Sequence, residues 1–275
     1  MGTFRSAMLD ALALLACLAC TPAAPAAAPA NAIVVDVELV LAVDISQSMD
    51  EREFALQRAG YVAALRHPDF INAVRAGTSG RIAIAYFEWA GTIRDDGVIA
   101  WQVVDSKESA NAFADKIAAR PFRSFRGTSI SGAVAFGAEL FTGTAFTGKR
   151  RVIDVSGDGP NNTGLPVTTA RDAALAKGII INGLPILISP SPTFSHLDRY
   201  YAECVTGGPG SFVLPIYAAS EFATATRRKL ILEVSGIEYP REDPRTIRID
   251  APIDCLQGER DRRFFSDPYF PELDR

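Results

Sequence analysis

The chain contains 275 residues and carries a formal net charge of −4. Hydrophobic residues make up 48% of it and charged residues 22%, which is the balance of an ordinary globular protein. Its length suits one large domain or two small ones. No basic patch stands out in the sequence, so nucleic acid is excluded as the expected partner.

The first 30 residues have the composition of an export signal. An apolar stretch runs from Ala7 to Cys20, too short to span a membrane, and an Ala/Pro-rich junction follows. This pattern predicts a signal peptide cleaved after Ala26 or Ala30. The alternative is lipoprotein processing at Cys17 or Cys20. We therefore expect an exported protein that is periplasmic, secreted or lipid-anchored, with membrane contact only through such an anchor.

Strands and helices alternate between residues 33 and 235. Near-continuous apolar runs predict strands at 34–43, 81–87, 97–104, 151–156, 179–186 and 211–216. Apolar residues at helical spacing predict helices at 51–66, 107–119, 166–177, 194–203 and 218–233. A further helix is expected after the segment 126–132, ending at about residue 140.

This alternation predicts an α/β domain over residues 33–235. We expect a doubly wound, mostly parallel six-stranded sheet with helices on both faces. A short Gly/Asp turn before residue 97 predicts that one edge strand is antiparallel.

Residues 236–275 form a polar, Pro-containing tail without periodicity, which either wraps the domain or is partly mobile. Only Cys204 and Cys255 remain after the signal segment. In an oxidising compartment, two cysteines predict one disulfide, which would pin the tail to the domain. The alternative is two buried thiols without a bond.

Asp44, Ser46 and Ser48 follow the first predicted strand at a spacing of two residues. The carboxyl edge of an open α/β sheet is where ligands bind. One carboxylate with neutral hydroxyls is a hard-oxygen set suited to Mg²⁺ or Mn²⁺. The alternative is that these residues only cap the helix that follows.

Two later loops add to this pattern. Thr128 precedes the helix that ends near residue 140, and Asp158 directly follows the fourth strand. Each has an ordinary alternative: Thr128 as a helix cap, and Asp158 as a turn residue before Gly159.

Two other carboxylates do not fit this pattern easily. Asp154 lies inside a strand, where a charge is costly unless paired, and Glu88 either reaches the metal or is a solvated strand-end residue.

The Asp-x-Ser-x-Ser motif, with Thr128 and Asp158 on the next loops in the same order, resembles the metal-ion-dependent adhesion site of von Willebrand factor type A domains. The resemblance covers about residues 35–235 and is nearest to uncharacterised bacterial secreted proteins. It implies a metal site made of Asp44, Ser46, Ser48, Thr128 and Asp158. It also implies that both aspartates act mainly through water, which leaves the ion electrophilic.

The predicted function is a non-enzymatic module that binds a divalent metal and, through it, a carboxylate of a partner protein. The two histidines, His67 and His196, lie beside helix boundaries, and no G-x-S-x-G pattern is present. The alternative is a metal-dependent hydrolase of the phosphatase type that uses Asp44. Phosphatases of that type need an Asp-x-Asp pattern, which this chain lacks because Ser46 stands at the third position.

Overall fold

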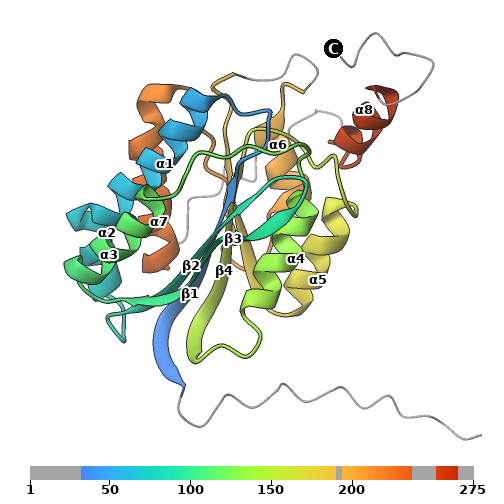
Figure 1. Ribbon diagram of the computed structural model, residues 1–275. Coiled ribbons are helices and arrows are strands. Elements are labelled where there is room, and N and C mark those ends of the chain that lie inside the picture. The colour runs from blue at the N-terminus through green and yellow to red at the C-terminus, as the bar shows by residue number, and fades with distance from the viewer. Residues whose placement is uncertain (1–31, 190–193, 237–251, 266–275) are drawn as a thin grey trace, which may run out of the picture.

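The computed structural model describes residues 32–189, 194–236 and 252–265 (Figure 1). The predicted signal segment, its cleavage sites and the candidate lipid-anchor cysteines lie outside these ranges, as does much of the predicted tail.

One sheet of five strands forms the centre of the described structure, in the order β3-β2-β1-β4-β5. The strands are β1 (Ile33–Asp44), β2 (Ile82–Trp89), β3 (Ile93–Val104), β4 (Phe146–Gly157) and β5 (Ile179–Pro185). All neighbours pair in parallel except β2 and β3, so the antiparallel edge strand is confirmed. The central strand β1 is buried from Val35 onward, which is why it is apolar almost throughout.

The predicted sixth strand is wrong. Residues 211–216 touch β5 and the residue after it only through isolated bridges, Gly183 with Val213 and Ile186 with Ile216. Pro185 has no N–H, so it cannot donate to the Leu214 carbonyl the hydrogen bond that would join the two bridges into one ladder. The apolar run is therefore buried beside the sheet without forming a strand.

Helices cover both faces of the sheet (Figure 1). One face carries α1 (Glu51–Arg66), α2 (Pro68–Arg75), α3 (Lys107–Ala118) and α7 (Phe222–Ser235). The other carries α4 (Ile130–Leu140), α5 (Val167–Ala176) and α6 (Leu197–Tyr200), which continues as a π-helical turn, Tyr201–Val205. A 3₁₀ turn, Ala219–Glu221, precedes α7. None of the helices in the described ranges is both long and apolar enough to cross a membrane.

Two helices were not predicted from the sequence. The first helix does end at His67, but α2 begins there, with Pro68 at a position where a missing N–H costs nothing. The His67 ring caps α2 by accepting a hydrogen bond from the N–H of Asp69 at 3.1 Å. The second, α8 (Gln257–Phe265), lies in the predicted tail, where its charged sequence shows no apolar period.

A buried ion cluster joins α7 to the sheet and explains Asp154. The Lys229 ammonium lies 2.5 Å from both the Asp154 and the Glu233 carboxylates, and all three residues are at most 1% exposed. The Tyr61 hydroxyl donates to Asp154 at 3.3 Å, and the Asn182 amide donates to Glu233 at 3.4 Å. The charge inside β4 is therefore paired, as a buried charge must be.

Candidate metal centre

Three loops carry the candidate ligands to one edge of the sheet. Asp44 is the last residue of β1, and Ser46 and Ser48 lie on the loop that follows. Asp158 follows β4, which pairs in parallel with β1, so the two strands end side by side. Thr128 lies two residues before α4. The structure thus brings together loops that are up to 110 residues apart.

Hydrogen bonds connect four of the five candidate residues. The Ser48 hydroxyl donates to Asp158 Oδ1 at 2.6 Å, and the Ser46 and Ser48 hydroxyl oxygens are 2.7 Å apart. Asp44 Oδ1 accepts the N–H of Ser46 at 2.7 Å. Asp44 is fully buried and Ser48 is exposed, so the group extends from the interior to the surface.

Thr128 is placed by a neighbouring loop rather than by the other candidate residues. Its N–H donates to the side-chain oxygen of Asn162 at 2.9 Å, and its carbonyl accepts the N–H of Asn162 at 2.8 Å. A Cβ at Gly159 would lie 4.0 Å from Thr128 Oγ1, which places this hydroxyl beside the Asp158 loop.

Other residues perform the capping that was the alternative role of the hydroxyls. Asp50 caps α1 in a capping box with Glu53. Ser129 caps α4 by accepting the N–H of Gly132 at 3.2 Å. The hydroxyls of Ser46, Ser48 and Thr128 are therefore not used as helix caps.

The residues present fit a small divalent cation. Asp44 Oδ2 is buried and has no hydrogen-bond partner among the described residues. A Cβ at residue 157 would lie 2.7 Å from that oxygen and 2.9 Å from the Tyr201 hydroxyl, so only glycine leaves this space open. An unpartnered buried carboxylate oxygen is costly, and a nearby cation or its bound water would satisfy it.

Electrostatics also favour a cation. Burial raises the pKa of Asp44 well above its usual value, and the nearby Asp158 raises it further. Burial raises the pKa of Asp158 to about 6, even though Ser48 donates a hydrogen bond to it. Two buried carboxylates close together repel each other, and a bound divalent ion would relieve that repulsion. Among the described residues, no group of three or more His, Cys, Asp or Glu is placed to hold a metal ion by itself, so hydroxyl oxygens are needed to complete the ligand set.

Glu88 is buried, and its carboxylate is paired with two arginines. Its side chain is 2% exposed and lies 2.9 Å from Arg120 and 3.5 Å from Arg58. It also accepts a hydrogen bond from the Tyr86 hydroxyl at 3.1 Å. The interpretation of Glu88 as a solvated strand-end residue is therefore wrong, and its charge is used to pair two arginines.

Sequence reasoning missed the residues that support Thr128. Asn162 holds it directly, and Asn161 Oδ1 accepts the N–H of Ser131 at 2.9 Å at the start of α4. From α8, Glu259 accepts a hydrogen bond from Asn161 at 2.7 Å. The pair of asparagines was visible in the sequence only as part of an Asn-x-Thr pattern.

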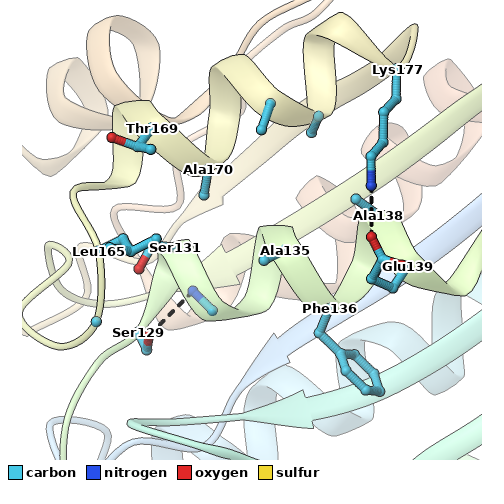
Figure 2. A pocket seen from close by; sticks show the side chains of 14 residues that line it. Ser129, Ser131, Ala135, Phe136, Ala138, Glu139, Leu165, Thr169, Ala170 and Lys177 are labelled. Carbon is cyan, nitrogen blue, oxygen red and sulfur yellow. Dashed lines mark hydrogen bonds and ion pairs between the residues drawn. The ribbon is translucent and has the colours of Figure 1, made fainter. Parts of the chain in front are cut away.

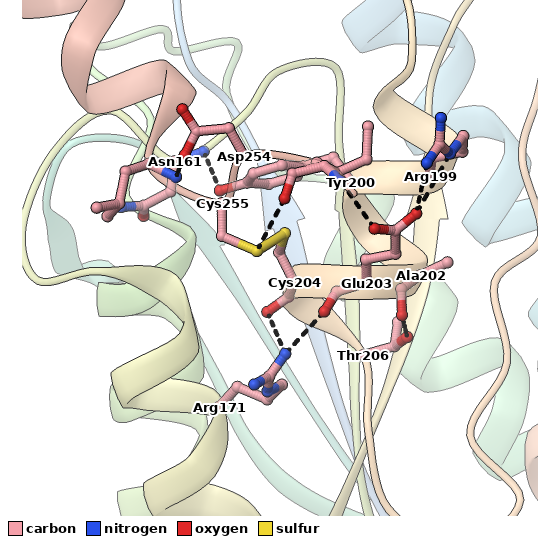
Figure 3. Close-up of a disulfide and its surroundings, with 12 residues drawn as sticks. Asn161, Arg171, Arg199, Tyr200, Ala202, Glu203, Cys204, Thr206, Asp254 and Cys255 are labelled. Carbon is pink, nitrogen blue, oxygen red and sulfur yellow. Dashed lines mark hydrogen bonds and ion pairs between the residues drawn. A yellow bond between two sulfur atoms is a disulfide. The ribbon is translucent and has the colours of Figure 1, made fainter. Parts of the chain in front are cut away.

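The predicted disulfide is present. Cys204 and Cys255 are bonded, with Cα atoms 5.5 Å apart, and the bond joins the π-helical turn to the segment before α8 (Figure 3). The Glu203 carboxylate also accepts the N–H of Ile253 at 2.9 Å. Part of the predicted tail is thus held against the domain, as expected from the bridge.

A separate groove of about 460 Å³ lies between α4 and α5 (Figure 2). Its walls are mostly apolar, with alanines such as Ala135 and Ala170 among them, and the ion pair of Lys177 with Glu139 lies at one end. It contains none of the five candidate residues, which instead lie on an open edge of the sheet.

Solved structures with the same fold are remote in sequence. Proximal thread matrix protein 1 from the mussel byssus, solved with a zinc-occupied MIDAS motif, has a TM-score of 0.54 and 16% identity over 74% of this chain and 49% of its own. The vWF domain of the pili tip protein Mfa5 from Porphyromonas gingivalis has a TM-score of 0.54 and 11% identity over 77% and 99%. A von Willebrand factor type A protein from Catenulispora acidiphila has a TM-score of 0.50 and 15% identity over 73% and 43%.

The chain spans about half the length of the mussel protein. No curated protein matches it. Residues 34–238 match the family described as "Protein of unknown function (DUF1194)". The match covers most of the chain and the fold agrees with the solved structures, so the chain belongs to this family of unknown function and contains a von Willebrand factor type A-like domain.

Proposed function

We propose that this protein is an exported, non-enzymatic module that binds Mg²⁺ or Mn²⁺ through Asp44, Ser46, Ser48, Thr128 and Asp158, and binds a partner protein through that metal. The observation that carries the proposal is the unpartnered Asp44 Oδ2, buried beside the hydrogen-bonded hydroxyls of the same loop. The zinc-occupied MIDAS motif of the mussel protein, which has the same fold, supports a metal at this edge.

The chemistry of the ligands suggests how the metal would act. Mg²⁺ prefers six oxygen ligands and keeps several waters. Ser46, Ser48 and Thr128 would offer neutral oxygens to the ion, while Asp44 and Asp158 would hold its waters. The ion would then retain most of its positive charge, and a partner carboxylate could bind it strongly. Ser48 is exposed, so a partner can reach this side of the site.

The disulfide supports the export that we propose. The disulfide between Cys204 and Cys255 is stable in an oxidising compartment, where an interaction module of a bacterial envelope would work.

The test is a calorimetric titration of Mg²⁺ and Mn²⁺ into purified residues 31–275, beside the variants Asp44→Asn and Asp95→Asn. Asp95 is an exposed carboxylate on β3 and serves as the matched control. We expect metal binding to disappear in Asp44→Asn only. Unchanged metal binding by Asp44→Asn, or no binding by the wild-type protein, would contradict the proposal.

The same variant has a second readout that needs no metal. Because burial raises the pKa of Asp44, its ionised form destabilises the metal-free fold at neutral pH. We therefore expect metal-free Asp44→Asn to be at least as stable as the wild-type protein. A variant that had merely failed to fold would instead be less stable, so the two causes of lost binding can be told apart.

A further inference from the structure

Four arginines lie along one side of the metal site: Arg94, Arg123, Arg126 and Arg262, here called the arginine arc. They come from β3, from the loop before α4 and from α8. They come from three segments that are far apart in the sequence, which is why no basic patch was visible there. The chain as a whole is acidic, with a net charge of −4, so the positively charged arc differs in sign from the chain as a whole.

The loop before α4 connects the arc to the site. The Phe125 carbonyl accepts the N–H of Gln47 at 3.0 Å, and the N–H of Phe125 donates to Ile45 at 3.1 Å. This loop therefore pairs directly with the Asp-x-Ser-x-Ser loop. The Arg94 guanidinium lies 5.5 Å from the Phe125 ring centroid, which places Arg94 over the same segment.

Arg126 is the arginine of the arc with the most open side chain. It is exposed, lies two residues before Thr128, and its side chain has no hydrogen bond or ion pair within the part of the chain that the structure describes. Its carbonyl accepts the N–H of Gly91 at 3.2 Å, so its backbone is fixed while its guanidinium is available to a partner.

Helix α8 brings Arg262 to the same place. Its guanidinium donates to the Asn162 carbonyl at 3.2 Å and to the Thr163 hydroxyl. A Cβ at Gly127, between Arg126 and Thr128, would lie 3.5 Å from Arg262 Nη1. The disulfide holds the start of this segment, so Arg262 lies beside the Thr128 loop because α8 is tethered there.

Charges around the site are unequally distributed. Asp96 pairs with both Arg94 and Arg123, and Asp95 is its exposed neighbour, so the arc keeps a net positive charge from Arg126 and Arg262. On the other side of the Asp-x-Ser-x-Ser loop, α1 begins with acidic residues, Asp50, Glu51 and Glu53. A partner that binds the metal would therefore meet an attractive side and a repulsive side.

We propose that the partner presents an acidic segment with at least two carboxylates, one bound to the metal and a second bound by Arg126 and Arg262. This inference rests on the proposed function, since it places the first carboxylate on the ion. It adds that α8 is part of the partner-binding surface and that the acidic side of the site fixes the direction of the segment. Arginine suits this role, because its planar donors match a carboxylate.

The test measures binding of a fluorescein-labelled hexaglutamate peptide by anisotropy in Mg²⁺, with hexaserine as the neutral peptide. The variants are Arg126→Glu, Arg262→Glu and, as the matched control, Arg52→Glu. Arg52 is exposed near the start of α1, on the acidic side of the site. We expect each arc variant to bind hexaglutamate about tenfold more weakly, and Arg52→Glu to change it less than about twofold. Arg126→Glu removes no side-chain hydrogen bond or ion pair among the described residues, so we expect it to fold like the wild-type protein.

Calorimetry with Mg²⁺ alone separates the two proposals. Suppose that the wild-type protein and Arg126→Glu bind Mg²⁺ with the same affinity. If they also bind hexaglutamate with the same affinity, the acidic-segment inference is overturned and the metal site stands. The inference also fails if the wild-type protein binds Mg²⁺ but no hexaglutamate. Hexaglutamate binding that persists unchanged in chelator would overturn the acidic-segment inference, because the first carboxylate would then not be on a metal, while calorimetry with Mg²⁺ alone would still decide the metal site.

Discussion

The buried Lys229 should be one of the most sensitive positions for the stability of this fold. Lys229→Met removes the cation between Asp154 and Glu233, which lie 2.5 Å from it on β4 and on α7 itself. Breaking a buried ion pair by removing one partner costs about 3–5 kcal/mol, because the remaining charge has no compensation. We expect a loss of this size at pH 8. The exposed Lys149, whose ammonium donates to a threonine hydroxyl, provides the control Lys149→Met, which should change stability by less than about 0.5 kcal/mol.

The loss should depend on pH in a defined direction. Burial and the nearby Asp154 raise the pKa of Glu233 from 4.5 to about 7. A raised carboxyl pKa means that the folded state holds a proton that the unfolded state has released. The contribution of this bound proton to the free energy of unfolding is complete below pH 4.5 and is lost as the pH rises through about 7. The difference of two to three pKa units corresponds to roughly 3 kcal/mol. Lys229→Met should therefore be less harmful at pH 5, where Glu233 is already neutral.

Urea denaturation followed by circular dichroism at pH 5 and pH 8 would measure both effects. The triple variant Asp154→Asn/Lys229→Met/Glu233→Gln removes every charge of the cluster and should show little of this pH dependence. A loss below about 1 kcal/mol at pH 8, or an equal loss at both pH values, would refute the argument that Lys229 neutralises buried carboxylates.

Three further substitutions test single features of the structure. Glu88→Gln should lower the free energy of unfolding, measured in urea, by about 2–4 kcal/mol, because two largely buried arginines lose their counter-charge. The Mg²⁺ affinity measured by calorimetry should stay unchanged, and a changed affinity would contradict the site described above. Gly157→Ala should weaken Mg²⁺ binding at least about tenfold, since its Cβ would lie 2.7 Å from Asp44 Oδ2, and equal binding would show that this space is not needed. The double variant Cys204→Ala/Cys255→Ala should lose up to about 4 kcal/mol of unfolding free energy, given the separation of 51 residues between the cysteines. Hydrogen exchange in α8 should rise before that in β1, and a uniform rise would indicate that α8 does not detach separately.

The parts of the structure that the sequence predicts well are those encoded locally. Strand β1 and the second half of β4 are mostly apolar and buried, and the polar residues after them lie at strand ends by necessity. Asp44 and Asp158 therefore meet because their strands are parallel neighbours. The error at residues 211–216 has a different origin: the run is apolar, but continuous pairing depends on a backbone donor that Pro185 lacks.

Other parts depend on contacts that no local pattern records. Asn162 supports Thr128 through two hydrogen bonds across 34 residues, and Arg262 reaches the same loop across about 100. Glu88 is buried because Arg58 and Arg120 converge on it from elsewhere in the chain. A sequence pattern identifies these residues as polar, but their partners are set by tertiary packing.

The tether of α8 has a consequence for how strongly the helix must bind to its own domain. A helix of nine residues is marginal in water, so α8 alone would be mostly unfolded and would dock weakly. Docking of α8 is intramolecular in any case, because residues 236–256 join it to α7. The bond between Cys204 and Cys255 shortens the free connection to Leu256 alone, and a shorter linker raises the effective local concentration of α8 at its docking site. A few hydrogen bonds, such as those of Glu259 and Arg262, are then enough to keep α8 in place. With the bond reduced, the same contacts would have to hold α8 at the lower effective concentration that the longer connection through residues 236–256 gives, so the thiol redox state changes the fraction of molecules that present Arg262 beside the metal site.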